Sequence, residues 1–262
     1  MGSIAGRAAL VTGGGSGIGA ATASRLAADG ALVTICGRTE EKLVTTAAQI
    51  HDTVGVDVRH IVADVTVESD VERAVSFAAE PADGLDIVFA NAGGSYHMGS
   101  IADADLDAVR ATIDVNLVGT VLCIKHAVPA MGARGGAIVG MSSGAGHFPH
   151  RFLPIYGAAK AGIEMLCKYA AEEFGARGIR VNCVQPGIIA DELMAPITAG
   201  GALLDDYLAQ MPAGRVGTVG DVAAVVRFLV DPESAWLTGA CVPIDGGHHL
   251  RRGANYQLLF GD

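Results

Sequence analysis

The stretch Thr12-Gly13-Gly14-Gly15-Ser16-Gly17-Ile18-Gly19 decides the fold of this chain. It follows the apolar run 8–12 and leads into a helix-like segment at 18–29. Residues without a Cβ let the backbone reverse and approach a pyrophosphate, whose charge then meets the free amides of a helix N-terminus. A glycine-rich turn alone also suits a tight strand-to-helix connection, but its place between the first strand and the first helix favours a dinucleotide site.

Short apolar runs alternate with longer helix-like segments along the whole chain. This alternation is typical of parallel strands joined by crossover helices. We therefore predict an α/β fold, a Rossmann-type, doubly wound sheet of seven parallel strands flanked by helices, in a single NAD(P)-binding domain over 1–262. The expected strands lie near 8–12, 32–36, 56–62, 85–90, 137–141, 180–184 and 241–244.

Composition excludes several classes of protein. With 262 residues, 50% of them hydrophobic and 18% charged, the chain can bury a full core and is not disordered. Its 18 basic and 28 acidic residues give a net charge of −10 without a basic face, so nucleic acid is an unexpected partner. The apolar runs are too short for a membrane helix, and no signal-peptide pattern is visible, so we expect a cytoplasmic protein. The five cysteines are widely spaced and without a C-x-x-C pair, and are expected to be reduced core residues.

Two segments depart from the regular alternation. Residues from about 188 to 212 carry Pro196, Gly200 and Gly201 among helix-compatible residues, which suggests a movable substrate lid. The C-terminal tail, 248–262, ends in apolar side chains and is expected to dock onto another surface, such as a second subunit.

Tyr156 and Lys160 stand at i and i+4, on one face of a helix. A free tyrosine has a pKa near 10 and is a poor base at neutral pH. A neighbouring cation, together with a positive nicotinamide ring, would lower the pKa of the phenol and let Tyr156 exchange a proton with an alcohol or carbonyl. On the pair alone, a core aromatic beside a solvated lysine is the favoured interpretation.

The spacing of Gly13, Gly17 and Gly19 resembles the T-G-x-x-x-G-x-G turn of the short-chain dehydrogenase/reductase family. Further matches run to Gly247, so the resemblance covers nearly the whole chain. It implies that Ser143, thirteen residues before Tyr156, is the catalytic serine that binds the substrate oxygen, in preference to Ser142.

The resemblance also assigns roles to two residues near the nicotinamide. Lys160 would bind the nicotinamide ribose hydroxyls. Asn116 would complete the catalytic set by holding a water that links the lysine to solvent. An asparagine bonded to a neighbouring strand is the alternative for Asn116.

Most of the expected cofactor contacts follow from the same resemblance. Asp64 would accept from the adenine amino group with the Val65 amide alongside, although a helix N-cap is an equal reading of the residues alone. Asn91-Ala92-Gly93 would support the sheet and pack beside the adenine ribose. The full expected set is Gly13, Ser16, Gly17, Ile18, Gly19, Arg38, Asp64, Val65, Asn91, Ala92, Gly93, Tyr156, Lys160, Pro186, Gly187 and Ile189.

Asp191 departs from the family pattern. Family members commonly carry a threonine four residues after the glycine that corresponds to Gly187, where it bonds the nicotinamide carboxamide. A carboxylate can accept from the carboxamide nitrogen but cannot donate to its oxygen. The resemblance therefore does not predict this contact with the carboxamide, which bears on cofactor affinity and on closure of the lid.

Arg38, at the end of the second expected strand, bears on the choice of cofactor. No carboxylate stands at 36–38 to accept a ribose 2′-hydroxyl, whereas an arginine can bind a 2′-phosphate. We therefore expect NADP(H) in preference to NAD(H). Ser16 argues against this, because phosphate-preferring relatives often carry a second cation there, and a solvated Arg38 is the alternative.

The expected activity follows from these residues and from the resemblance. It is an NAD(P)(H)-dependent oxidoreductase, a short-chain alcohol dehydrogenase or carbonyl reductase, that transfers a hydride between nicotinamide C4 and a secondary alcohol or ketone. Substrate contacts are expected from Ser95, His97, Ser143, Phe148 and Tyr156. No catalytic metal is expected, because His147 and His150 have no identifiable third ligand.

Two other functions are less favoured. A non-catalytic, dinucleotide-binding regulatory module would have lost the serine, tyrosine or lysine, and all three are present. An enoyl reductase on the same scaffold would show a wider spacing between tyrosine and lysine. By analogy with the family, we expect a homotetramer or homodimer.

Overall fold

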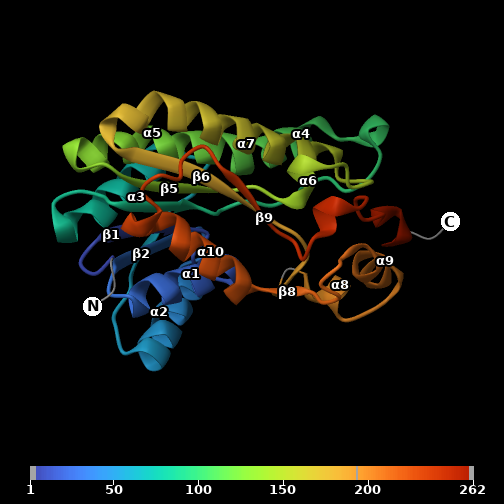
Figure 1. Ribbon diagram of the computed structural model, residues 1–262, viewed down its shortest axis with the longest axis horizontal. Coiled ribbons are helices and arrows are strands. Elements are labelled where there is room, and N and C mark those ends of the chain that lie inside the picture. The colour runs from blue at the N-terminus through green and yellow to red at the C-terminus, as the bar shows by residue number, and fades with distance from the viewer. Residues whose placement is uncertain (1–3, 193, 260–262) are drawn as a thin grey trace.

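The structure is a computed structural model that describes residues 4–192 and 194–259. Seven parallel strands form one sheet in the order β3-β2-β1-β4-β5-β6-β9, which confirms the predicted doubly wound fold (Figure 1). The strands are β1 (Ala8–Thr12), β2 (Leu32–Gly37), β3 (Arg59–Val62), β4 (Ile87–Ala90), β5 (Gly136–Met141), β6 (Ile179–Pro186) and β9 (Cys241–Ile244).

Helices cover both faces of the sheet (Figure 1). Helices α1, α2 and α10 pack on one face, and α3, α5 and α7 pack on the other. The helices are α1 (Gly17–Ala28), α2 (Glu40–Val54), α3 (Glu68–Ala79), α4 (Leu106–Ile113), α5 (Gly119–Met131), α6 (Gly144–His147), α7 (Pro154–Phe174), α8 (Ala195–Thr198), α9 (Ala202–Gln210) and α10 (Val219–Val230). Each face of the sheet has its own apolar core, so the central strands are buried on both sides, as parallel strands usually are.

Two strands, β3 and β6, have ends that differ from the sequence prediction, because pairing with a neighbouring strand determines where each begins or ends. The edge strand β3 begins at Arg59, opposite Thr34 of β2, instead of near residue 56. Strand β6 runs on to Pro186, because its last residues pair with Pro243 and Ile244 of β9. This longer β6 carries the segment Pro186-Gly187 to the edge of the sheet where the site lies.

One continuous helical stretch, Leu106–Arg134, is long and apolar enough to cross a membrane by length and composition. It contains a π-helical turn at Asp114–Val118 between α4 and α5. Half of its most apolar window is buried inside the protein, where Cys123 and Ala127 belong to the core beside α3 and β4. Its apolar character is therefore that of a core helix.

The expected lid and tail pack on each other. The lid contains α8 and α9, and its first residues form a small two-stranded sheet, β7 (Ile189–Ala190) with β8 (Gly217–Thr218). The described part of the tail folds back within the same chain, and Tyr256 packs in a cluster with Leu203 and Tyr207 of α9. Figure 1 shows the described part of the tail beside α9. Phe260, which was expected to dock, lies outside the described residues.

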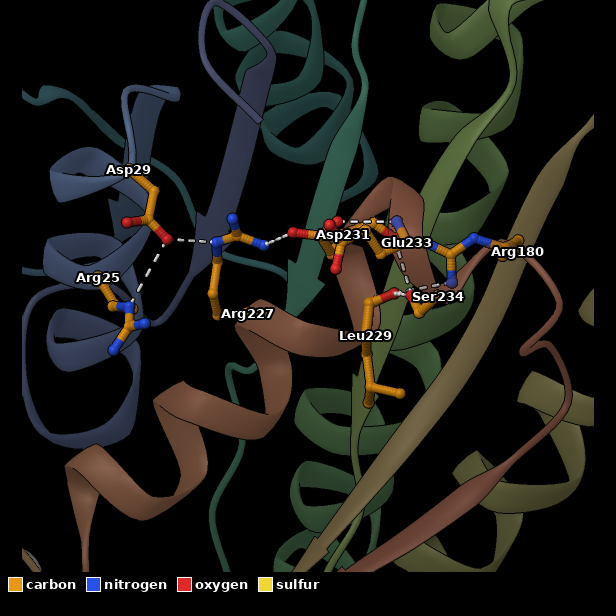
Figure 2. A network of polar contacts seen from close by, with 8 residues as sticks. All are labelled: Arg25, Asp29, Arg180, Arg227, Leu229, Asp231, Glu233 and Ser234. Carbon is orange, nitrogen blue, oxygen red and sulfur yellow. Dashed lines mark hydrogen bonds and ion pairs between the residues drawn. The ribbon is translucent and has the colours of Figure 1, made fainter. Parts of the chain in front are cut away.

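A polar network ties the end of α10 to the end of α1 (Figure 2). Arg227 Nε donates to Asp29 Oδ2 at 2.5 Å, and its Nη1 donates to Asp231. Arg25 approaches the same Asp29 carboxylate at 3.6 Å. Arg180 of β6 donates to the main-chain carbonyl of Asp231 at 3.1 Å. The network fixes α10 against both the first helix and the sheet.

Candidate active site

The carboxyl ends of the central strands open on one cavity of about 560 Å³. The glycine-rich turn follows β1, Asn91 follows β4, Ser143 follows β5, and Pro186 ends β6. Helix α7 contributes Tyr156 and Lys160 from the side. This is the crevice where open α/β sheets bind their ligands.

The glycine-rich turn fits a pyrophosphate. A Cβ on Gly19 would come within 2.2 Å of the Gly13 carbonyl oxygen, so any larger residue would collide with the backbone of the turn. Gly13 and Gly17 have φ values of +63° and +53°, which favour glycine. The Ser16 side chain makes no capping bond, so the first amides of α1 remain available to an anion.

Asn91 holds the turn in place. Its Nδ2 donates to the carbonyls of Thr12 and Gly13 at 2.9 and 3.2 Å, and its own N–H donates to Thr12 Oγ1 at 3.0 Å. The Ala92 amide donates to the same hydroxyl. The end of β4 is thereby tied to the end of β1.

The far end of the cavity carries the residues expected around the adenosine. Asp64 Oδ1 accepts from the amide and the hydroxyl of Thr66 at 2.9 and 2.8 Å, so this carboxylate closes a local turn and is not the N-cap of α3. The Arg38 guanidinium lines the cavity and donates to the Tyr96 hydroxyl at 3.4 Å.

Tyr156 and Lys160 both lie at the inner end of the cavity. The Lys160 ammonium is 5.4 Å from the centre of the Tyr156 ring and donates to the Met141 carbonyl at 2.7 Å. Burial raises the pKa of Tyr156 to about 12, opposed by a hydrogen bond with Ser143 and reinforced by the Tyr256 phenol. Burial lowers the pKa of Lys160 to about 7.

The sequence prediction named a neighbouring cation together with a positive nicotinamide ring as the groups that lower the pKa of Tyr156. The protein's own groups favour the neutral phenol, because the loss of hydration on burial outweighs the opposing effect of Ser143. The joint effect of the cation and the nicotinamide ring stays a prediction.

The two serines after β5 have separate partners. Ser142 Oγ donates to Glu164 Oε1 at 2.8 Å and approaches the Lys160 carbonyl at 3.1 Å, so this hydroxyl is engaged with α7. Ser143 is the N-cap of α6, where its Oγ accepts from the Ala145 amide at 3.2 Å, and it acts to lower the pKa of Tyr156. Of the two serines, Ser143 is the one that acts on the tyrosine.

Asn116 lies in the π-helical turn and is fully buried. Its Nδ2 donates to the carbonyls of Gly94 and Thr112 at 2.6 and 2.7 Å, and its Oδ1 accepts from the Gly94 amide at 3.3 Å. These bonds hold the loop after β4. They are close to the alternative given above for Asn116, an asparagine bonded to a neighbouring strand. A Cβ on Gly93 would lie 2.4 Å from Asn116 Oδ1 and 3.1 Å from Lys160 Nζ, so the asparagine and the lysine flank the same glycine.

Every residue expected to bind cofactor lines this cavity, as do Ser95, Ser143 and Tyr156 from the substrate set. Two expected substrate contacts lie elsewhere. The His97 ring is bonded to the Ser100 carbonyl in its own loop, and Phe148 packs against His150. The sequence set missed several cavity residues of the lid and tail, among them Met194, Ile197, Tyr207 and Tyr256. The one sequence feature that pointed to these residues is the apolar character of the two irregular segments, the lid and the tail.

Within the described part of the chain, no three histidine, cysteine or acidic side chains come together to hold a metal ion.

The chain is similar to known proteins over most of its length. Residues 13–249 match a family model described as enoyl-(acyl carrier protein) reductase. The chain is 39% identical over 249 residues to trans-4-hydroxycyclohexanecarboxylate dehydrogenase of Sinomonas cyclohexanicum, covering 93% of each protein. It is 37% identical over 271 residues to cyclohexanol dehydrogenase of Rhodococcus sp. (strain TK6), covering 93% of this chain and 96% of that protein.

A solved structure gives the same result. A short-chain type dehydrogenase/reductase from Mycobacterium ulcerans superposes with a TM-score of 0.95 and 38% identity, over 98% of this chain and 94% of that one. The chain therefore belongs to the short-chain dehydrogenase/reductase family.

Proposed function

We propose that the enzyme interconverts compact cyclic secondary alcohols and their ketones, with Tyr156 as the acid/base. The observation that carries this proposal is the placement of Tyr156, Ser143 and Lys160 at the inner end of a cavity whose outer part is a dinucleotide cradle. The ring-shaped substrate class is supported by the names of two relatives, which act on cyclohexanol and on a hydroxycyclohexanecarboxylate.

The reaction class follows from family membership. The enzyme is an NAD(P)(H)-dependent oxidoreductase of the alcohol dehydrogenase type, acting on a CH–OH donor or its carbonyl product. The relatives are named as dehydrogenases, so a regulatory module without chemistry is not supported. The bound nicotinamide dinucleotide supplies the hydride acceptor or donor.

In this proposal the protein's residues divide the remaining work. The Tyr156 hydroxyl exchanges the proton of the substrate oxygen, and the Ser143 hydroxyl binds the same oxygen as charge develops on it. Lys160 binds the ribose next to the nicotinamide. Asn116 positions the loop that ends at Gly94 and flanks Lys160 across Gly93, where a water can join the lysine to solvent.

The cofactor contacts proposed here are the cavity residues expected from the sequence. Amides of the turn at Gly13 to Gly19 and of α1 bind the pyrophosphate, and Asp64 with Val65 faces the adenine. Asn91 to Gly93 lie beside the adenine ribose, and Pro186, Gly187 and Ile189 lie beside the nicotinamide. We place the 2′-phosphate of NADP(H) at Arg38 and therefore favour NADP(H) over NAD(H).

We also infer that the enzyme is a homotetramer or homodimer. Support comes from apolar side chains that helices flanking the sheet present to solvent, with Met165 of α7 52% exposed and Val121 of α5 39% exposed. Light scattering measures the mass directly.

A cytoplasmic location is part of the same proposal. All five cysteines are free thiols, which suits a reducing compartment.

The test is steady-state oxidation of cyclohexanol by the purified enzyme, with NADP and NAD in parallel. We expect turnover by the wild-type enzyme, and turnover at least about 1,000-fold slower by the Tyr156→Phe variant. The variant lacks the one hydroxyl on which general acid–base catalysis and correct protonation of the substrate oxygen depend. The variant should bind NADPH normally, as followed by reduced nicotinamide fluorescence. Substantial turnover by the variant would remove Tyr156 from the proposed role.

A further inference from the structure

A pair of tyrosines forms the wall of the cavity contributed by the lid and the tail. The hydroxyls of Tyr207, on α9, and Tyr256, in the tail, lie 2.7 Å apart. Both residues line the cavity, and their side chains are almost fully buried, with 3% and 5% exposure. The Tyr256 phenol is close enough to raise the pKa of Tyr156, which places the pair near the reacting end of the cavity.

The tail is held firmly against α9. Arg252 forms an ion pair with Asp206, whose Oδ2 also accepts from the Asn255 amide at 3.0 Å. Asn255 also forms an isolated main-chain bridge with Arg151. Tyr256 follows directly, so its position is fixed by main-chain and ionic contacts and not by its ring alone.

The tyrosine pair leaves hydrogen-bonding capacity unused. One phenol donates its hydrogen to the other, so the second hydrogen has no acceptor among the described residues. The neighbouring His150, which also lines the cavity, approaches the Phe148 carbonyl with Nδ1 at 3.2 Å. A carbonyl only accepts, so Nδ1 carries the proton and Nε2 is an acceptor with no partner in the described chain.

This wall is uncharged at neutral pH. Burial lowers the pKa of His150 to about 4, so its imidazole is neutral. The wall therefore offers one phenolic donor and one imidazole acceptor, which a single ligand hydroxyl can satisfy together.

Cations are placed away from this wall. Among the described residues that line the cavity, the cationic side chains are Arg38 and Lys42 at the adenosine end and Lys160, which donates to Met141. Arg252 lies outside the cavity lining and is paired with Asp206. A carboxylate on a bound substrate would thus lose its hydration without gaining a partner.

We propose that Tyr207 and Tyr256 are specificity-determining residues that select an uncharged ring alcohol or ketone carrying a second neutral oxygen remote from the reacting carbon. Tyr256 makes the C-terminal tail part of the substrate site. This inference rests on the proposed function and adds the chemical class of substrate that the site prefers.

Three probe substrates test it, namely cyclohexane-1,4-diol, cyclohexanol and 4-hydroxycyclohexanecarboxylate, each ring compound supplied as both isomers where isomers exist. For the wild-type enzyme we expect kcat/KM to be about tenfold higher for the diol than for cyclohexanol, after correction for its two equivalent hydroxyls. The carboxylate should fall below cyclohexanol by at least about 100-fold, because an unpaired buried charge is costly.

The Tyr256→Phe variant keeps the ring and removes the hydroxyl. Its preference for the diol over cyclohexanol should shrink to less than about threefold. Tyr169→Phe, on the exposed side of α7, is the matched control and should keep the wild-type ratios. Unchanged circular dichroism and NADPH affinity establish that both variants are folded.

Either of two results overturns the inference: a carboxylate substrate used as well as the diol, or a diol preference that survives Tyr256→Phe. Failure of the proposed function gives a different result, the absence of turnover with all three compounds and both cofactors. In that case, calorimetric dissociation constants of the diol and the carboxylate for the enzyme–NADP complex, in wild type and Tyr256→Phe, decide the inference without turnover.

Discussion

The Asp191 carboxylate lies against Gly17 of the glycine-rich turn, with Oδ2 3.0 Å from the position that a Cβ on Gly17 would occupy. Its other oxygen accepts the Met194 amide at 2.8 Å at the start of the lid. A residue where the family usually has threonine therefore joins the lid to the cradle proposed for the pyrophosphate. It also brings a negative charge close to an anionic ligand.

Replacing this charge should strengthen cofactor binding. Asp191→Asn keeps an oxygen acceptor for the Met194 amide and removes the repulsion of the pyrophosphate. We expect NADPH and NADH to bind about fivefold more tightly at low salt, a change of about 1 kcal/mol. Fluorescence titration measures it, and the gain should shrink in roughly 0.5 M salt through screening. Equal affinity at low salt would mean that Asp191 serves the lid alone.

Arg38 should control the choice between the two cofactors. We expect Arg38→Ser to weaken NADPH binding by at least about tenfold, the effect of losing one charge-assisted bond to the 2′-phosphate. NADH binding is the internal control and should change by less than about twofold, within ordinary surface effects. A wild-type enzyme that binds NADH as tightly as NADPH would identify Arg38 as a solvated cation.

The network of Figure 2 predicts unequal effects of two arginines on stability. Arg227 is 11% exposed and bridges two carboxylates, whereas Arg25 is 53% exposed and contacts only Asp29 in this network. We expect Arg227→Met to lower the free energy of unfolding by about 2–4 kcal/mol, because it leaves Asp29 and Asp231 facing each other. The matched variant Arg25→Met should cost less than about 0.5 kcal/mol. Urea denaturation compares them, and equal losses would contradict the bridging role.

His150 should make the protein sensitive to acid. Its pKa in the folded state is about 4, below its ordinary value of 6.5, so between these pH values the unfolded chain binds a proton that the folded chain excludes. Stability is therefore fully present above pH 6.5 and falls as the pH drops toward 4, by up to about 1.4 kcal/mol per pH unit from this group. Urea midpoints across this range should fall less steeply in His150→Asn, while the neighbouring His147→Asn serves as the control and keeps the wild-type slope.

The sheet was predictable because its signals are local. Each buried strand carries a run of apolar residues, and Gly13 and Gly19 stand in a turn in which a Cβ would collide with neighbouring atoms. Tyr156 and Lys160 needed only helical spacing to be placed together. Strand ends were less exact, since β6 continues to Pro186 only because β9 pairs with it.

The substrate side was less predictable because its residues meet only in the folded chain. Tyr207 and Tyr256 are separated by 49 residues, and nothing near either one marks it as a partner of the other. The burial that raises the pKa of Tyr156 is likewise a property of the whole fold, which spacing along the chain does not reveal.

The tail begins after β9, the last strand of the sheet, and reaches the cavity through Tyr256. A segment in that place can be lengthened, shortened or exchanged without breaking any hydrogen bond of the sheet. The residues proposed for proton transfer, on α7, and those proposed to recognise the substrate thus lie on segments that can evolve independently. A family built this way can diversify what its members act on while the chemistry is inherited unchanged.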